Sequence, residues 1–284
     1  MNGGNTLAFR ADGKRVKNGD PMYTVAPFIM DKRYDAMNMI TVDIPLAPVK
    51  QYINEKRKEG IRLSRMGLLT AAYIRTVYEF PLLNHFIVNK RIYKRNEFPV
   101  AMVVLRDLKS QQATMSKVNF ELDDTVFEVE RKLNEYVEKN KEVTSENNTD
   151  KMIKFLLSVP GLLSFGVSVI KFLDKHGLLP KFIIDLSPFH AALTITNLAS
   201  IRTNHIYHHL YEFGTTSVFI AMGNSREIPK KRGDEVVLER CMPLGVVMDE
   251  RICSGSYFAM AFRKFKSYLE NPALLEVKPE NSEK

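Results

Sequence analysis

Apolar residues recur at helical spacing in three parts of the chain. In residues 45–60 and 125–139 they return every three or four positions between charged residues, which predicts two amphipathic helices. Residues 68–78 are apolar on most faces of a helix. We therefore expect that third helix to be deeply packed.

Shorter apolar runs predict strands. Residues 98–105 form an apolar run with β-branched residues near its end, and residues 86–88 and 92–93 frame a basic turn as in a hairpin. From Ala191 onward, short apolar runs alternate with turn residues until a final helical stretch. Strands and helices are therefore mixed along the chain, and no internal repeat is apparent.

One segment near the C-terminus resembles a catalytic motif with two residues exchanged. Residues 249–255 read Asp-Glu-Arg-Ile-Cys-Ser-Gly. This resembles the Asp-His-Arg-x-x-Asp-Gly signature of the 2-oxoacid dehydrogenase acyltransferase catalytic domains, and the related His-His-x-x-x-Asp-Gly of the chloramphenicol acetyltransferases. Glu250 stands at the position of the histidine and Ser254 at the position of the aspartate, so the motif is degenerate.

Other segments resemble the same family in the same order. They are similar to its first strand (39–44), its long helix with a Phe-Pro-x-x-Asn ending (68–84), its Phe-Thr-Ile-Ser-Asn-Leu stretch (193–198), the strand that follows (218–223), and its closing helix and tail (259–275). The resemblance implies an α/β fold of the α+β two-layer sandwich type. We expect a chloramphenicol acetyltransferase-like mixed β-sheet with flanking helices, assembled as a trimer.

The resemblance also implies a domain organisation. We expect a flexible N-terminal arm over residues 1–23, a single acyltransferase-like domain over 24–276, and a polar tail over 277–284. Residues 104–190 match the family poorly, and within them 151–188 form an apolar helical insert broken near Pro160.

The apolar insert allows two interpretations. Packing in the core or between copies of the chain is the simpler one. The alternative is a lid or wall for an apolar acyl chain, or a patch that contacts a membrane surface as a peripheral protein does. The uncharged stretch 155–170 is too short and too interrupted to be an ordinary transmembrane segment, so none is predicted.

Charge and cysteine content narrow the partners only slightly. The formal charge is +8 and the pI is near 9.3, and such a surface attracts the phosphates of coenzyme A, an acidic acyl carrier, anionic lipid or nucleic acid. Nucleic acid is the least favoured partner, because no zinc-finger spacing or aromatic RNA-binding signature is present. The only cysteines are Cys241 and Cys253, which suits a reducing cytoplasm, and no signal peptide is evident.

The resemblance implies acyl transfer from a coenzyme A thioester, used as co-substrate, or from an acylated carrier. In the resembled families the site lies between subunits of a trimer, where one subunit supplies the base and its neighbour a hydroxyl. Thr196 stands where the family has the serine that stabilises the oxyanion, and threonine offers the same donor. The resemblance also implies three positions that contact the substrate, namely Asn197, Ser254 and Gly255. The glycine is kept because a tight turn or close packing tolerates no side chain.

The base is the weak point of this interpretation. A thiol has a pKa of about 8.5, histidine about 6.5 and glutamate about 4.3, so exchanging His for Glu costs about 3 kcal/mol of driving force for proton transfer. Burial could raise the pKa of Glu250 enough to close that gap, or the carboxylate could be purely structural.

A second candidate base lies in the run from His205 to Glu212. His208 or His209 would be well matched to work near pH 7 if either reached the substrate channel. On a helix, His205, His209 and Glu212 would share one face as metal ligands, but no second ligand cluster supports a metal and none is predicted. If neither base operates, the chain is a catalytically inactive homologue that serves as a trimeric ligand-binding or scaffold protein.

Overall fold

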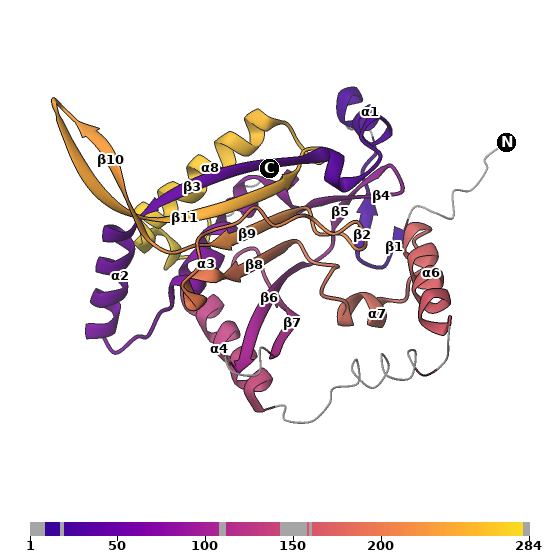
Figure 1. Cartoon of the computed structure of the whole chain (residues 1–284), viewed down its shortest axis with the longest axis horizontal. Helices are drawn as coiled ribbons and strands as arrows, with labels where there is room; N and C mark the ends of the chain where they lie inside the picture. The colour runs from indigo at the N-terminus through magenta and orange to yellow at the C-terminus, as the bar shows by residue number, and fades with distance from the viewer. Residues whose placement is uncertain (1–8, 18–19, 108–111, 143–157, 159–160, 281–284) are drawn as a thin grey trace.

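A seven-stranded mixed β-sheet lies at the centre of the computed structural model, which describes residues 9–17, 20–107, 112–142, 158 and 161–280 (Figure 1). β8 runs parallel to β6 and β9, and the other pairs are antiparallel. The predicted fold class, a mixed sheet with flanking helices, is confirmed. The strand order is β10 (Arg226–Arg232), β11 (Glu235–Asp249), β9 (Val218–Met222), β8 (Leu193–Asn197), β6 (Phe98–Asp107) and β7 (Gln112–Phe120), and β3 (Met37–Pro45) pairs with β11.

β11 is 15 residues long, whereas the sequence predicted only short strands in this region. Its second half, residues 241–249, is buried on both faces and pairs with β3 along one edge and with β9 along the other. A strand enclosed in this way reads as a continuous apolar run, which the sequence pattern did not separate from its neighbours. Its first half leaves the sheet with β10 as a projecting hairpin (Figure 1), where Val236 is 70% exposed.

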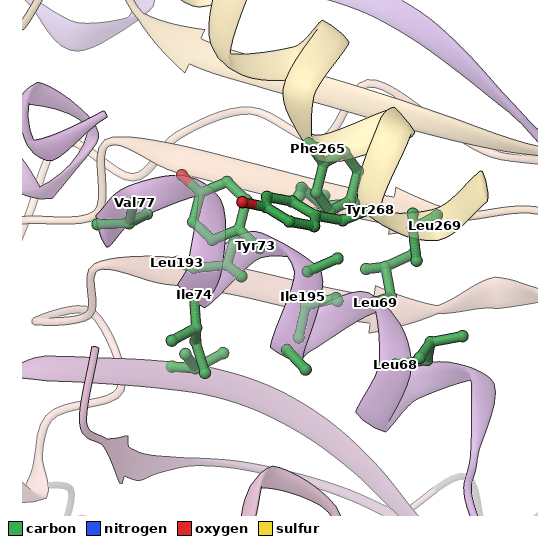
Figure 2. Close-up of a cluster of buried hydrophobic side chains, with 14 of the residues drawn as sticks. Leu68, Leu69, Tyr73, Ile74, Val77, Leu193, Ile195, Phe265, Tyr268 and Leu269 are labelled. Carbon is green, nitrogen blue, oxygen red and sulfur yellow. The ribbon is translucent and has the colours of Figure 1, made fainter. Parts of the chain in front are cut away.

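Four helices form the layer that shields one face of the sheet. The predicted helices are confirmed as α2 (Leu46–Lys58), α3 (Arg65–Glu79), α4 (Val126–Glu142) and α8 (Gly255–Glu270). Figure 2 shows the core where α3 meets β8 and α8: Tyr73 is fully buried and its ring meets that of Phe265 edge-on at 6.1 Å. Short 3-10 turns lie at Arg33–Ala36, Pro81–Asn84, Leu198–Ile201 and Pro272–Leu275.

The described part of residues 1–23 is not the flexible arm that the sequence predicted. β1 (Phe9–Arg10) and β2 (Gly13–Arg15) join a second, four-stranded sheet with β5 (Arg91–Arg95) and β4 (His85–Val88), and α1 (Pro21–Ile29) follows. Arg10 explains the order: it is 5% exposed and pairs with Asp12 at 2.8 Å and with Asp174 at 2.6 Å. This long-range ion pair could not be read from a polar, glycine-rich sequence.

Within the described residues, the apolar insert forms α6 (Leu162–Lys175) and α7 (Lys181–Leu186). Core packing is wrong for its aromatic rings, because Phe165 is 67%, Phe172 58% and Phe182 65% exposed in the single chain. Packing between copies of the chain, the other half of the simpler interpretation, stays a prediction. The predicted break near Pro160 lies outside the described residues. No helix in the described ranges combines the length and apolar character that a membrane crossing would need.

The face of the sheet opposite the main helices is crossed by residues 203–210, which are extended rather than helical. Gly223 and Gly245 make the crossing possible: a Cβ atom on Gly223 would lie 2.1 Å from the His205 nitrogen, and one on Gly245 would lie 2.1 Å from the Ile206 oxygen. The shared helical face of His205, His209 and Glu212 therefore does not exist. Among the described residues, no group of three or more potential metal ligands is present.

We predict that Gly245→Ala destabilises the protein by about 1–3 kcal/mol, because the new methyl group overlaps the Ile206 carbonyl and must displace the crossing backbone. Gly255→Ala is the matched control: no atom lies within 4 Å of the position that a Cβ would take there, at the start of α8, so a gain of up to about 1 kcal/mol is expected. Urea unfolding measures both. Equal effects would contradict the tight crossing.

Candidate functional site

A buried cluster of charges fixes the altered motif at the end of β11. Asp249 is fully buried, and both its oxygens accept hydrogen bonds from Arg251, through Nε at 2.8 Å and Nη2 at 2.8 Å. Arg33 approaches the same carboxylate at 3.4 Å. Burial lowers the pKa of the Arg33 guanidinium, and the charge of Asp249 opposes that shift. The aspartate and arginine of the motif thus pair with each other and not with Glu250.

Glu250 stands at the histidine position and is anchored by neighbours from β3 and the turn before it. Its backbone N–H donates to the Ala36 carbonyl at 2.9 Å, and its Oε2 accepts a hydrogen bond from Asn38 Nδ2 at 2.6 Å. The side chain is only partly buried in the single chain. Sequence reasoning missed Asn38, because it lies more than 200 positions away along the chain.

Ser254 and Gly255 begin α8. The Ser254 hydroxyl accepts a hydrogen bond from the Tyr257 N–H at 3.1 Å, which makes this residue an N-cap. Gly255 is exposed and has open space around it, so the close packing expected for it does not occur within one chain. The serine at the aspartate position therefore has a structural role that its sequence context did not reveal.

Thr196 and Asn197 end β8 and open onto a cavity of about 550 Å³. The side-chain oxygen of Asn197 is buried there and has no hydrogen-bond partner. The rest of the wall comes from α3, α4, β6 and the turn after β8, and it is lined by Ser64, Met66, Met102, Val103, Glu130, Leu133, Asn134, Tyr136, Val137, Leu198, Ser200 and Ile201.

The structure does not bring Thr196 and Glu250 together within one chain. In the sheet, Thr196 of β8 pairs with Ala221 of β9, and Ala221 pairs with Gly245 of β11. Glu250 follows Gly245 by five positions and lies two strands away from Thr196. At about 3.3 Å per residue and about 4.8 Å per strand, the two Cα atoms are about 19 Å apart.

His208, in contrast, lies on the same face of the sheet as Thr196. Its ring stacks on Phe219 with the centroids 4.2 Å apart. Phe219 pairs with Thr194, which lies two residues before Thr196. The side chains of Phe219 and Thr196 therefore point to the same face of the sheet, and the Cα atoms of these two residues are about 8 Å apart. His209 is exposed and stacks on His208 at 4.6 Å.

A hydrogen bond sets the proton position on His208. Its Nδ1 lies 2.8 Å from the His209 carbonyl oxygen, which can only accept. Nδ1 therefore carries the proton in the neutral ring and Nε2 keeps its lone pair, the form that a base requires.

His205, which sequence reasoning considered only as a metal ligand, meets a hydroxyl instead. Its Nε2 lies 3.1 Å from Thr41 Oγ1. Thr41 pairs with Gly245 and so belongs to the same row across the sheet as Thr196. Burial, followed by the charge of Arg226, lowers the pKa of His205, which favours the neutral ring.

Both cysteines are free and buried. Burial raises the pKa of the Cys253 thiol well above its ordinary value. A thiol held protonated in this way is a poor nucleophile, so Cys253 is an inert core residue.

Comparison with known proteins shows which family part of this chain resembles. Residues 190–277 match the family of 2-oxoacid dehydrogenases acyltransferase (catalytic domain), a stretch that includes Thr196, His208 and the altered motif. The dihydrolipoyllysine-residue acetyltransferase component of the acetoin cleaving system from Bacillus subtilis (strain 168) is 32% identical over 85 residues. That alignment covers 30% of this chain and 21% of the relative, so it spans about a fifth of the relative's length.

Solved structures extend the likeness of fold over nearly the whole chain. The probable dihydrolipoamide acetyltransferase from Listeria monocytogenes 4b F2365 gives a TM-score of 0.57 at 11% identity and covers 95% of this chain and 97% of its own. The cubic core of the pyruvate dehydrogenase multienzyme complex gives 0.60 at 10%, with 92% and 94% covered. Chloramphenicol acetyltransferase gives 0.55 at 9%, with 90% and 99% covered.

The fold is therefore that of the chloramphenicol acetyltransferase-like proteins. Within that class, the resemblance to the 2-oxoacid dehydrogenase acyltransferase catalytic domains is confirmed, with Glu250 and Ser254 as departures from the motif.

We predict that Asp249→Asn lowers the free energy of unfolding by roughly 3–5 kcal/mol, because it leaves Arg33 and Arg251 buried together without an anion. Asp43→Asn is the matched control. Asp43 pairs with Arg226 at the surface at 3.2 Å, where a loss below about 1 kcal/mol is expected. Denaturant unfolding measures the free energy of unfolding of both variants. A loss below about 1 kcal/mol for Asp249→Asn would show that its carboxylate is not needed to neutralise the two buried arginines.

Proposed function

We propose that this chain transfers an acyl group from a thioester, carried by coenzyme A or by an acylated carrier protein, to an acceptor nucleophile. The observation that carries the proposal is the position of Thr196, which lines the cavity and whose side chain points to the face of the sheet where His208 lies. A tetrahedral oxyanion needs a hydrogen-bond donor, and the attacking nucleophile needs a base. Both groups are available within the matched stretch 190–277.

The Thr196 hydroxyl would donate a hydrogen bond to the oxyanion, and Asn197 would contact the substrate beside it. His208 is the base we favour, because its Nε2 is the unprotonated nitrogen and an imidazole suits proton transfer near pH 7. His209 would position His208 through its carbonyl oxygen and the stacked ring.

Glu250 is the alternative base, and it requires a second copy of the chain. At about 19 Å within one chain it cannot reach the Thr196 site, so only a neighbouring subunit could bring its carboxylate there. The cubic core among the structural relatives shows that this fold self-associates in that protein. We propose a homotrimer for this chain, with a cytoplasmic location that suits its two unpaired cysteines.

A second candidate function is a trimeric ligand-binding or scaffold protein without catalysis. The observation that favours it is that both exchanged motif residues have structural partners: Glu250 accepts from Asn38, and Ser254 caps α8. The two functions differ in whether a bound thioester is ever consumed.

We predict that Thr196→Val reduces thiol release from an acyl-coenzyme A panel by about 100- to 1,000-fold, the usual effect of losing one oxyanion donor. Valine keeps the shape and removes the hydroxyl. Thr196→Ser restores a hydroxyl and should retain most of the activity. Thioester binding with no thiol release from the wild-type chain, whatever the acceptor, would establish the scaffold function instead.

The base is identified by a second set of variants. His208→Gln should reduce turnover by about 100-fold or more, whereas Glu250→Gln should leave turnover intact. His176→Gln is the matched control, because its Nδ1 also contacts a carbonyl, that of Phe172 at 2.7 Å, on α6 outside the site. The reverse pattern would assign the base to Glu250 of a neighbouring subunit.

A further inference from the structure

The cavity beside Thr196 has two chemically different parts. Its polar rim is formed by Thr196, Asn197 and Ser200, and the side-chain oxygen of Asn197 is buried without a hydrogen-bond partner. Its wall is apolar over most of its surface and is built from Met66 of α3, Met102 and Val103 of β6, Leu133, Tyr136 and Val137 of α4, and Leu198 and Ile201 of the turn after β8.

The wall is firmly held in place by the protein around it. Glu130 of α4 accepts hydrogen bonds from the Ser64 N–H at 3.0 Å and its hydroxyl at 2.9 Å, at the start of α3. Gly67 permits this contact, because a Cβ there would lie 1.8 Å from the Glu130 carboxylate. On the other side, Tyr136 donates to the Met102 carbonyl at 3.2 Å. α4 is thus fixed to both α3 and β6, and the cavity between them is a built feature of the fold.

We infer that this cavity receives the acyl chain of the thioester donor, and that the chain is apolar and about six carbons or longer. The inference rests on the proposed function, which places the thioester carbonyl at Thr196. A space of 550 Å³ is on the order of 18 groups the size of a water molecule, at about 30 Å³ each, and an acetyl group would leave most of it unfilled. It falls within the range of about 300–1,000 Å³ that is usual for small-molecule sites.

The orientation of the donor follows from the two parts of the cavity. The acyl tail lies against the methionine and leucine side chains, and the carbonyl lies at the Thr196 hydroxyl. An amide N–H of the pantetheine arm, which coenzyme A and acyl carriers share, donates to the Asn197 oxygen. The described helices of the apolar insert take no part, because α6 and α7 line other cavities.

The test compares S-acetyl-pantetheine with S-hexanoyl-pantetheine by isothermal titration calorimetry on the full chain. Each buried methylene contributes about 0.8 kcal/mol, or roughly fourfold in affinity, so partial burial of four methylenes predicts at least about 30-fold tighter binding of the hexanoyl compound. Coenzyme A thioesters of the same two acyl groups then show whether the nucleotide adds affinity, which separates coenzyme A from a carrier as the source.

Val137→Phe fills the cavity and should reduce the hexanoyl-to-acetyl affinity ratio to below about 3, since the added ring occupies the space of the distal methylenes. Val236→Phe introduces the same change on the exposed β10–β11 hairpin and should leave the ratio unchanged. Ile201→Ala, at a 44% exposed position of the wall, provides a second variant with little risk to folding and should reduce the ratio by about fourfold or more.

The possible outcomes separate the two proposals. Equal affinity for both thioesters, with no effect of Val137→Phe, overturns the acyl-chain inference and leaves the acyltransferase function standing. No binding of either thioester overturns both. If Val137→Phe changes the oligomeric state in sedimentation velocity while the ratio stays constant, the cavity is a contact between copies and the inference is wrong.

Discussion

The carboxylate of Asp249 is the group on which the arrangement of this molecule depends. It is enclosed with two guanidinium groups at the end of the longest strand, and each of those groups continues to other parts of the fold. Arg251 donates to the Met30 carbonyl at 3.1 Å, after α1. Arg33 donates to the carbonyls of Tyr211 at 2.6 Å and Ile87 at 3.0 Å. One buried anion thus joins the motif loop, the segment after residue 203 and the smaller sheet, and burying it alone would be prohibitively costly.

This constraint explains how the motif can lose two residues and the fold remain. The internal Asp249–Arg251 pair satisfies its own charges, so neither exchanged position has to supply one. Ser254 is then free to cap a helix and Glu250 to bond Asn38. The polar groups with room to act lie instead on the far face of the sheet, where two glycines admit an extended segment that carries His205 and His208. The proposed catalytic groups Thr196 and His208 and the altered motif therefore lie in different parts of the molecule.

Much of the fold could be predicted from the sequence because its elements are strongly periodic. The helices at 45–60, 68–78 and 125–139 and the strand at 98–105 all appear close to their expected bounds. The failures have particular physical causes. Strands β1 and β2 depend on a distant partner for Arg10, and β7 and the length of β11 depend on pairing that leaves no local signal. The helix expected from the histidine spacing is overruled by backbone contacts that only Gly223 and Gly245 allow. At the site, Thr196 could be located by resemblance, but the cavity beside it could not, since four separate elements build its wall.

The first strands have a practical consequence for work with shortened forms of this protein. Arg10 faces Asp174, whose carboxylate also lies 3.2 Å from His190 Nε2, and this contact fastens α6 to the main body. A recombinant fragment that begins at α2 would lack Arg10, and α6 would lose its ion pair with that residue. The exposed face of α6 carries the rings of Phe165 and Phe172. Such a fragment would be expected to aggregate on purification, and its behaviour would then say little about the intact chain.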